Sequence, residues 1–187
     1  MVGSRRPISL SYFKNKRLTN PVVVSPDAGG VARAKLFLDA LCSDNIGASG
    51  SLAVIIKQRA QPGVVAAMHI VGSVDGCDVI IVDDMIDTAG TLCTAANEMK
   101  RSGALRVFAF ATHGLFNGPA AKRIEASHID EVIVSNTVPL RRDITDVTHK
   151  IRQISVGKLL EGAIRAIHSG ESISQLFTLD MGGRLLA

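Results

Sequence analysis

Short runs of β-branched and other apolar residues alternate along the chain with longer segments whose apolar positions recur at helical spacing. Uninterrupted Val and Ile runs are typical of parallel strands that are buried on both faces of a sheet. Strands that alternate with helices indicate right-handed strand–helix–strand crossovers. The pattern therefore predicts an α/β fold with a single open parallel sheet flanked by helices. The predicted strands are 22–25, 52–56, 79–82, 107–112, 131–135 and 151–156, and the predicted helices are 30–42, 91–102, 119–126 and 156–168, with a further short helix near residues 10–13.

The most distinctive polar residues follow the apolar run at 79–82. Two adjacent carboxylates, a third carboxylate and a small-residue turn lie between this predicted strand and the helix predicted from residue 91. The backbone N–H groups of the turn and of the first helical turn can bind a phosphate, because these donors are unpaired and the positive end of the helix dipole lies there. Gly90 lets the backbone come close to a ligand, because it lacks a Cβ atom. The carboxylates would be misplaced beside a bare phosphate, but they suit sugar hydroxyls or a bridging divalent cation.

A phosphorylated sugar with Mg²⁺ satisfies both parts of this segment, and we predict a ligand of this kind. The alternative is a structural role, in which Asp87 or Thr88 is the N-cap of the following helix. Two consecutive carboxylates at the end of a buried strand repel each other, so they need a partner in either case. The candidate binding residues are Asp83, Asp84, Asp87, Thr88, Ala89, Gly90 and Thr91.

A second apolar strand leads into Ser25-Pro26-Asp27-Ala28-Gly29-Gly30 and a predicted helix. This loop resembles the corresponding loop of the ribose-phosphate pyrophosphokinase family, and segment 79–91 resembles the phosphoribosyl-pyrophosphate loop of the class I phosphoribosyltransferase fold. Further matches occur in the family's own order, so the resemblance extends from residue 21 to residue 177 or close to it. The matching segments are 21–35, 56–59, 68–72, 79–91, 111–120, 130–140 and 170–174.

The resemblance assigns roles to the acidic loop and to Asp27. It implies that Asp83 and Asp84 contact the ribose 2- and 3-hydroxyls, and that the turn from Asp87 to Thr91 holds the 5-phosphate. Asp27 matches a residue that binds a Mg²⁺ ion associated with ATP. Its alternative role is to stabilise the turn in which it lies.

Lys57 and Arg59 match the two cations of a family loop that closes over the transferring pyrophosphoryl group. Two cations beside developing phosphate charge provide the stabilisation that phosphoryl transfer requires. Without the resemblance, both residues would be interpreted as ordinary solvated loop charges. Gln58 departs from the pattern, since bacterial members often carry a basic residue there, but Lys57 and Arg59 keep their spacing.

The implied activity is that of a ribose-phosphate diphosphokinase, which converts ATP and ribose 5-phosphate into AMP and 5-phosphoribosyl 1-pyrophosphate. Family members carry two similar domains in one chain, and this sequence begins near the start of the second. The first domain supplies much of the ATP pocket, including a His that shares the metal with the residue matching Asp27. We therefore expect a ribose 5-phosphate-binding half that is inactive or weakly active alone. The expected divisions are a basic N-terminal extension at 1–20, a phosphoribosyltransferase-like domain at 21–178 and a tail at 179–187.

Two other functions are alternatives to this one. The first is a phosphoribosyltransferase that consumes phosphoribosyl pyrophosphate, although no aromatic-bearing segment suited to stacking a nucleobase is evident. The second is a non-catalytic subunit that regulates a full-length synthetase. The expected partners are otherwise further copies of the chain. His113, after the strand at 107–112, is either a site-lining or a structural residue.

Composition and charge exclude several other classes of protein. Only 4% of the residues are aromatic, so the core must be built from Val, Ile, Leu and Ala. The net charge of +4 comes without a long basic run or interleaved aromatics, which favours phosphorylated metabolites over nucleic acid as the ligand. No apolar stretch approaches the length of a membrane span. The isolated residues Cys42, Cys77 and Cys93 lack metal-ligand spacing, and we expect reduced thiols in a cytoplasmic protein.

Overall fold

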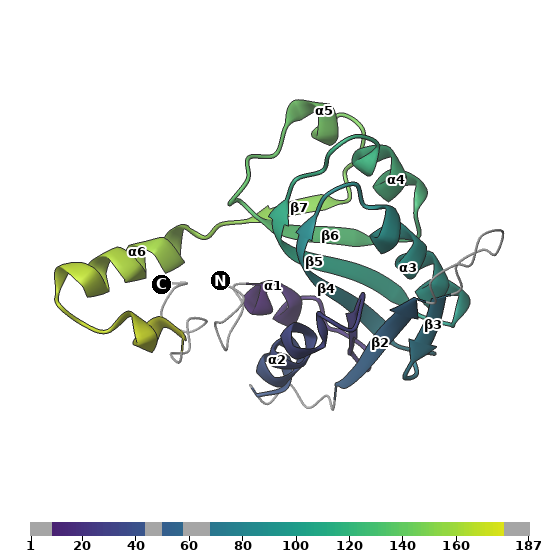
Figure 1. Cartoon of the computed structure of the whole chain (residues 1–187), viewed down its shortest axis with the longest axis horizontal. Helices are drawn as coiled ribbons and strands as arrows, with labels where there is room; N and C mark the ends of the chain where they lie inside the picture. Colours follow the sequence, from purple (N-terminus) through teal and green to yellow (C-terminus); the bar gives the residue numbers. More distant parts are fainter. Residues whose placement is uncertain (1–8, 44–49, 58–67, 178–187) are drawn as a thin grey trace.

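The computed structural model describes residues 9–43, 50–57 and 68–177. Seven strands form one sheet in the order β3-β2-β1-β4-β5-β6-β7 (Figure 1). All neighbouring strands are parallel except β2 and β3, so the predicted α/β class with an open, mostly parallel sheet is confirmed. The strands are β1 Val22–Ser25, β2 Ser51–Lys57, β3 Met68–Val71, β4 Asp78–Ile86, β5 Arg106–Gly114, β6 Glu131–Ser135 and β7 Ile151–Ile154; the helices are α1 Leu10–Lys14, α2 Val31–Cys42, α3 Gly90–Arg101, α4 Ala120–Ala126, α5 Arg142–Thr145, α6 Gly157–His168 and the 3₁₀ helix η1 Ile173–Phe177.

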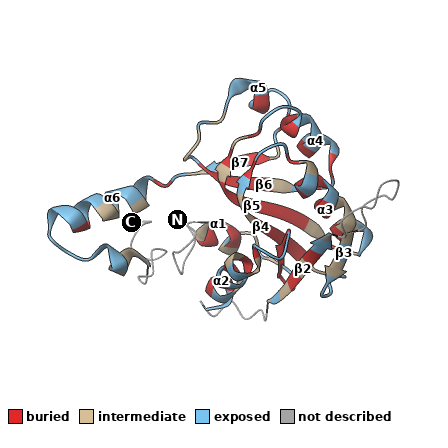
Figure 2. Ribbon diagram, in the orientation of Figure 1, coloured by how far each residue is buried: buried red, intermediate tan, exposed pale blue. Residues whose placement is uncertain are grey.

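The central strand β4 is buried on both faces, because successive side chains of a strand point to opposite sides. Val79 and Ile81 pack into one apolar cluster with α3 and α4. Ile80 and Val82 pack into a second cluster with α1 and α2. The helices therefore cover both faces of the sheet, and the buried strands lie between them (Figure 2).

Helix α1 belongs to the second of these clusters. The Phe13 side chain is fully buried, and its ring makes edge-to-face contacts with Phe37 and Phe108 at centroid distances of 5.7 and 5.9 Å. Such aromatic pairs contribute roughly 0.5–1.5 kcal/mol beyond their buried area. The segment around α1 thus packs on the sheet, while the predicted division at residue 20 stays a prediction.

The acidic pair lies inside a strand and not after it, which corrects the prediction. We predicted that the strand would end at Val82, but β4 continues through Asp83 and Asp84 to Ile86. The extension forms because β5 runs beside it, with Met85 paired to His113 and Ile86 paired to Gly114. Backbone pairing with β5 therefore outweighs the low strand propensity of Asp.

Helix α6 lies beside the main body of the molecule and packs on η1 (Figure 1). Ala166 is its one buried residue, while Leu160, Ile164 and Ile167 are exposed (Figure 2). Across the described ranges, we find no helix with the length and apolar character needed to span a membrane.

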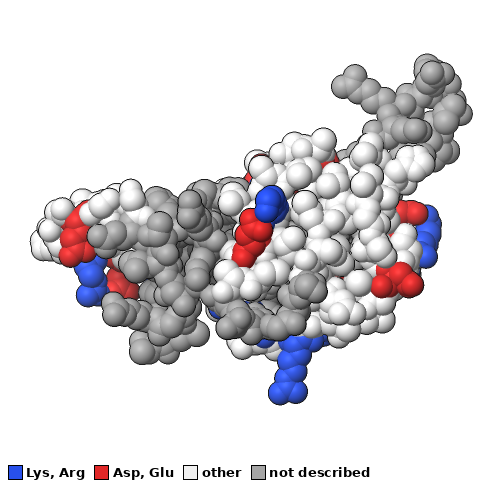
Figure 3. Space-filling view, turned by 90° about the horizontal axis from the view of Figure 1, so that it is seen from below, with Lys and Arg blue, Asp and Glu red and all other residues white. Residues whose placement is uncertain are grey.

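Charged side chains on the face seen in Figure 3 lie apart or in small groups between uncharged residues. The exposed pairs Lys35–Asp39 and Glu161–Arg165 are each one helical turn apart. Exposed pairs of this kind contribute roughly 0–1 kcal/mol, so they do little to determine the fold.

Candidate functional site

The carboxyl ends of β1 and β4 form the switch point of the sheet. From β1 the chain passes through α2 to β2 on one side, and from β4 it passes through α3 to β5 on the other. In open α/β sheets, ligands bind where the connections diverge in this way. β1 ends at Ser25, whereas β4 continues to Ile86 and β2 to Lys57, so functional residues gather above the shorter strand.

Arg33 joins the two carboxylates of β4 to helix α2. Its Nη1 donates to Asp83 Oδ1 at 2.9 Å, and its Nη2 donates to Asp84 Oδ2 at 3.1 Å. The Arg33 side chain is 22% exposed, and those of Asp83 and Asp84 are 35% and 45% exposed. The acidic pair therefore has the partner that its mutual repulsion requires, and that partner comes from the helix after the Asp27 loop.

The backbone also contacts this pair. The Asp84 N–H donates to Asp83 Oδ1 at 2.9 Å, and the Met85 N–H donates to Asp84 Oδ1 at 2.8 Å. Burial raises the pKa of Asp83, and the neighbouring Asp84 carboxylate adds to this rise. Burial also opposes ionisation of Asp84, but the Arg33 charge and the backbone N–H donors outweigh it and lower the pKa of that carboxyl. The two neighbouring carboxyl groups thus differ in acidity.

The turn after β4 leads directly into α3. Ala89, with φ of 57°, is in the left-handed region and is the N-cap of the helix, and no side chain caps it. The alternative that Asp87 or Thr88 caps the helix is therefore wrong. Within the described residues, the N-cap residue Ala89 makes no side-chain cap hydrogen bond, and a phosphate can complete such an arrangement.

The loop after β5 holds this turn in place. Asn117 Nδ2 donates to Asp87 Oδ1 at 2.8 Å, and the Asn117 N–H donates to the Asp87 carbonyl at 3.1 Å. Arg123 Nη1 donates to the Thr88 carbonyl at 3.0 Å. Arg141 donates to the carbonyls of Leu115 and Phe116, which fixes the supporting loop in turn. Contacts within the protein therefore hold the turn in this shape.

Asp27 lies in the exposed loop between β1 and α2. Its Oδ1 accepts the Gly30 N–H at 2.8 Å, and its carbonyl accepts the Ser25 hydroxyl at 2.6 Å. A Cβ on Gly30 would lie 2.7 Å from Ser25 Oγ, so this position has no room for a side chain. The turn-stabilising role is thus present, and the exposed carboxylate also fits Mg²⁺, which is commonly bound through one or two carboxylates plus water and phosphate. Within the described ranges, no group of three or more His, Cys, Asp or Glu residues could hold a metal ion.

The two predicted catalytic cations are not placed by the structure. Lys57 is the last residue of β2, so its backbone lies beside the switch point. Its side chain is not described. Arg59 lies outside the described residues. Their roles stay predictions.

His113 belongs to a hydrogen-bond network at the ends of β5 and β6. Its Nδ1 lies 2.9 Å from Thr137 Oγ1, and Ser135 Oγ donates to the Thr112 carbonyl at 2.7 Å and lies 2.9 Å from Thr137 Oγ1. This network satisfies the ring on one side, which supports the structural interpretation. It brings no further candidate residue to the switch point.

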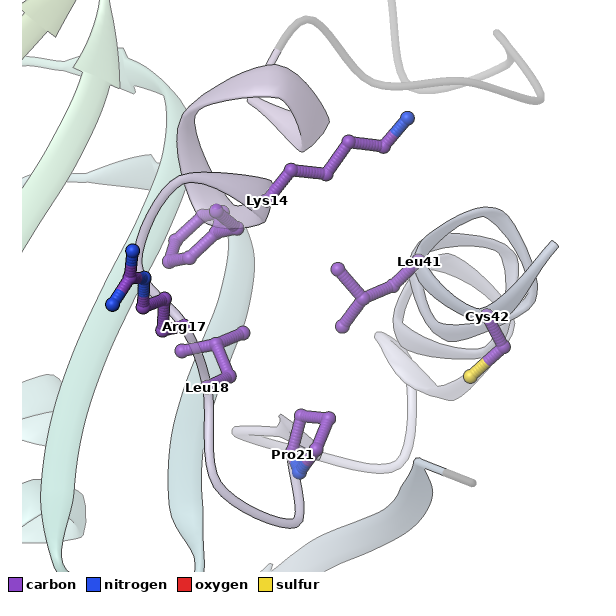
Figure 4. Close-up of a pocket in the computed structure, with 7 residues that line it drawn as sticks. Lys14, Arg17, Leu18, Pro21, Leu41 and Cys42 are labelled. Carbon is purple, nitrogen blue, oxygen red and sulfur yellow. The ribbon is translucent and has the colours of Figure 1, made fainter. Parts of the chain in front are cut away.

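A small hollow lies elsewhere, between α1 and α2, with a volume of about 70 Å³. Leu41 points into it from α2, and Leu18 and Pro21 line it from the segment before β1 (Figure 4). None of the described residues that line it carries a carboxylate, and most of them are apolar. It therefore does not suit a sugar phosphate.

The fold and the switch point together define a phosphoribosyltransferase-like α/β domain. The crystal structure of phosphoribosylpyrophosphate synthetase from Mycobacterium smegmatis is similar, with a TM-score of 0.73 and 33% sequence identity over 87% of this chain and 51% of that chain. The predicted fold class is confirmed.

The model of the phosphoribosyl synthetase-associated domain family matches residues 48–178, and the chain belongs to this family. It is 49% identical over 172 residues to the ribose-phosphate pyrophosphokinase of Shewanella oneidensis, covering 92% of this chain and 52% of that protein. It is 45% identical over 171 residues to the ribose-phosphate pyrophosphokinase of Vibrio cholerae, covering 91% and 52%. The predicted resemblance is confirmed, and the chain spans about half the length of the curated relatives it matches.

Sequence reasoning missed three residues that contact the candidate site, namely Arg33, Asn117 and Arg123. Arg33 and Asn117 lie within segments that match the family, but nothing in their spacing shows which side chain they contact. Arg123 lies in α4, and its position in the sequence is that of an ordinary solvent-exposed charge on a helix. Their contacts arise from tertiary packing alone.

Proposed function

We propose that this chain is the ribose 5-phosphate-binding part of a ribose-phosphate diphosphokinase. The observation that carries the proposal is the pair Asp83–Asp84 at the switch point, in the strand that leads through the turn at Ala89 into the N-terminus of α3. Family membership supplies the ligand class, and the site supplies acceptors for sugar hydroxyls next to donors for a phosphate. The hydroxyl groups of one sugar phosphate match the acceptors, and its phosphate matches the donors.

Each residue has a role in this proposal. Asp83 and Asp84 accept hydrogen bonds from the ribose 2- and 3-hydroxyls. The backbone N–H groups of the turn from Asp87 to Thr91 bind the 5-phosphate, and Asn117 and Arg123 keep the turn in its binding shape. Asp27 would hold Mg²⁺, which supplies positive charge beside the phosphates when it is bound.

The complete reaction needs more than these residues. In the full enzyme, the ribose 1-hydroxyl attacks the β-phosphorus of ATP, the bond to the α-phosphate oxygen breaks and AMP leaves. Lys57 and Arg59 stabilise the transferring group by charge, and no protein nucleophile takes part. The chain spans about half the length of its relatives, so we propose that most of the ATP site comes from the other half.

Calorimetry of ribose 5-phosphate with the purified 187-residue chain tests the proposal. We expect saturable binding at one site per chain, and ribose without the phosphate should bind at least about tenfold more weakly, because it lacks the charge that the α3 N-terminus attracts. A parallel assay with ATP, Mg²⁺ and ribose 5-phosphate should release little or no AMP. Absence of ribose 5-phosphate binding would refute the proposal, whereas sugar-dependent AMP release would show that this chain builds an ATP site of its own.

The non-catalytic subunit that regulates a full-length synthetase is the second candidate function. Such a subunit would change the turnover of a full-length synthetase when mixed with it. A chain that binds ribose 5-phosphate but leaves a full-length synthetase unaffected would contradict the subunit role.

A further inference from the structure

Arg33 is a partly buried cation that contacts two neighbouring carboxylates. Its two terminal nitrogens contact one oxygen of each carboxylate, at 2.9 Å on Asp83 and 3.1 Å on Asp84. The group of three side chains carries one net negative charge instead of two. Adjacent carboxylates without such a cation are typical ligands of divalent metal ions.

We propose that Arg33 determines the ligand specificity of the Asp83–Asp84 pair, making it a receptor for neutral hydroxyl groups and preventing it from binding a divalent cation. The inference rests on the proposed function for the identity of the hydroxyl ligand. Its cation-excluding part depends only on the contacts of Arg33.

Electrostatics gives the first reason. A divalent cation bound between these carboxylates would lie within a few ångströms of the guanidinium, and the two would repel each other. Even with the screening of bulk water, this repulsion lowers cation affinity about tenfold, and more in a partly buried site. A hydroxyl group carries no net charge, so it meets no such repulsion and still gains a charge-assisted hydrogen bond to the carboxylate.

The hydrogen-bond pattern gives the second reason. Asp83 Oδ1 already accepts from Arg33 and from the Asp84 N–H, while both Asp84 oxygens accept from Arg33 and the Met85 N–H. Among the described residues, no donor to Asp83 Oδ2 is found. The acceptor positions that remain on the two carboxylates have fixed directions and suit hydroxyl groups, whereas Mg²⁺ needs several oxygens in octahedral geometry.

The placement of Arg33 indicates a role beyond holding α2 against β4. Its Nε is buried without a hydrogen-bond partner in the described part of the chain. A buried unpaired donor is unfavourable, so fold stability alone does not account for a guanidinium at this point. A residue that sets ligand specificity does account for it, since both contacts are to the carboxylates of the site.

The test measures Mn²⁺ binding by electron paramagnetic resonance on the full chain. All proteins carry Asp27→Asn, which removes the other proposed cation ligand. Arg33→Met removes the charge and keeps the length of the side chain, and Arg33→Gln removes the charge and keeps a hydrogen-bond donor. We expect each to bind one Mn²⁺ ion per chain at least about tenfold more tightly than the Asp27→Asn parent. Adding Asp83→Asn to Arg33→Met should abolish this gain, which assigns the new site to the pair.

Ribose 5-phosphate calorimetry on the same proteins separates this proposal from the proposed function. Arg33→Met should bind ribose 5-phosphate more weakly than the parent, with Arg33→Lys in between. If the parent binds the sugar phosphate and neither charge-removing variant gains a Mn²⁺ site, the role of Arg33 is overturned while the proposed function stands. If both variants lose the fold, the proposal is overturned as well, because Arg33 is then a structural tie. If Mn²⁺ binding is gained but the parent binds no sugar phosphate, the proposed function and the hydroxyl part of this inference are overturned together.

Discussion

Asp87 differs from the other two candidate carboxylates in having no cation beside it among the described residues. It is exposed, and one of its oxygens accepts from the Asn117 side chain. A residue in this position contributes little to the fold, but it shapes the turn that leads into α3.

We therefore predict that Asp87→Ala abolishes ribose 5-phosphate binding and leaves the unfolding free energy within about 1 kcal/mol of wild type. Calorimetry and urea unfolding measure the two quantities. The matched control is Asp39→Ala, which removes an exposed carboxylate on α2 that pairs with Lys35 and should leave binding unchanged. Unchanged affinity in Asp87→Ala would show that the phosphate turn is wrongly assigned.

Lys57 is predicted to act on the transferring group and not on the sugar phosphate. Lys57→Ala should therefore keep ribose 5-phosphate affinity within about threefold of wild type, because only interactions made in the transition state are lost. In a complete two-domain enzyme, the same change should lower kcat on the order of 100-fold or more. A large loss of sugar-phosphate affinity in calorimetry would contradict this division of roles.

At this scale, a functional residue can be predicted from the sequence when the residues next to it in the chain form a recognisable pattern. The acidic pair and the turn from Asp87 to Thr91 stand out because strand, carboxylates and small residues are contiguous. Arg33 does not stand out, because its contacts are with residues that lie 50 and 51 positions away. No local pattern encodes a contact of this kind.

At the scale of elements, β4 and β5 are joined at their amino ends by an ion pair whose carboxylate is buried. The Asp78 side chain is 1% exposed, and its oxygens accept from Arg106 Nε at 2.9 Å and Nη2 at 2.6 Å. The Thr19 N–H donates to Asp78 Oδ2 at 2.6 Å. Burial opposes the charge, but these donors outweigh it and lower the pKa of Asp78.

The direction of this shift gives a pH dependence. A carboxyl whose pKa is lower in the folded state than in the unfolded state stabilises the fold above the unfolded pKa, which is about 4, and this contribution is lost as the pH falls through the folded value. Asp78→Asn should therefore lower the unfolding free energy by about 1–3 kcal/mol at neutral pH, and the difference from wild type should shrink below about pH 4.

Urea unfolding at neutral and acidic pH measures this difference, with Asp39→Asn as the exposed control. A difference that stays constant down to the acid unfolding transition would exclude the ion pair as its source.

Strands with a continuous buried apolar run can be predicted from the sequence, whereas elements without such a run or a helical period are missed. The strand at 22–25 and the strand at 131–135 have the predicted bounds, because each is a run of buried residues between polar ends. β3 was missed because its four residues alternate in burial and its antiparallel pairing with β2 is not encoded locally. α5 was missed because four residues carry no helical period.

At the scale of the whole molecule, α3 and α6 have the same length and very different surroundings. Each has 12 residues. α3 buries five side chains against the sheet, whereas α6 buries Ala166 and leaves Leu160, Ile164 and Ile167 at 49%, 67% and 65% exposure. The sequence predicted both helices but not this difference, because an apolar stripe does not show what packs on it.

We predict that amide hydrogen exchange in α6 is at least about tenfold faster than in α3, because stability within a protein follows the packing of each unit. Exchange measured by mass spectrometry on peptides from the two helices tests this, with α3 as the internal control. Equal protection at low protein concentration would contradict the prediction. Protection of α6 that rises with concentration would show that a second copy of the chain covers it.

The backbone contacts of the acidic pair have a practical consequence. Each carboxylate accepts a hydrogen bond from a different amide, Asp83 from the Asp84 N–H and Asp84 from the Met85 N–H. The resonance position of an amide proton depends on the acceptor it faces, so these two amides are built-in probes of the two side chains. In a nitrogen–proton correlation spectrum, a ligand that engages one carboxylate would move one peak and leave the other in place. The protein thus contains one amide probe for each acidic side chain, without any added reporter group.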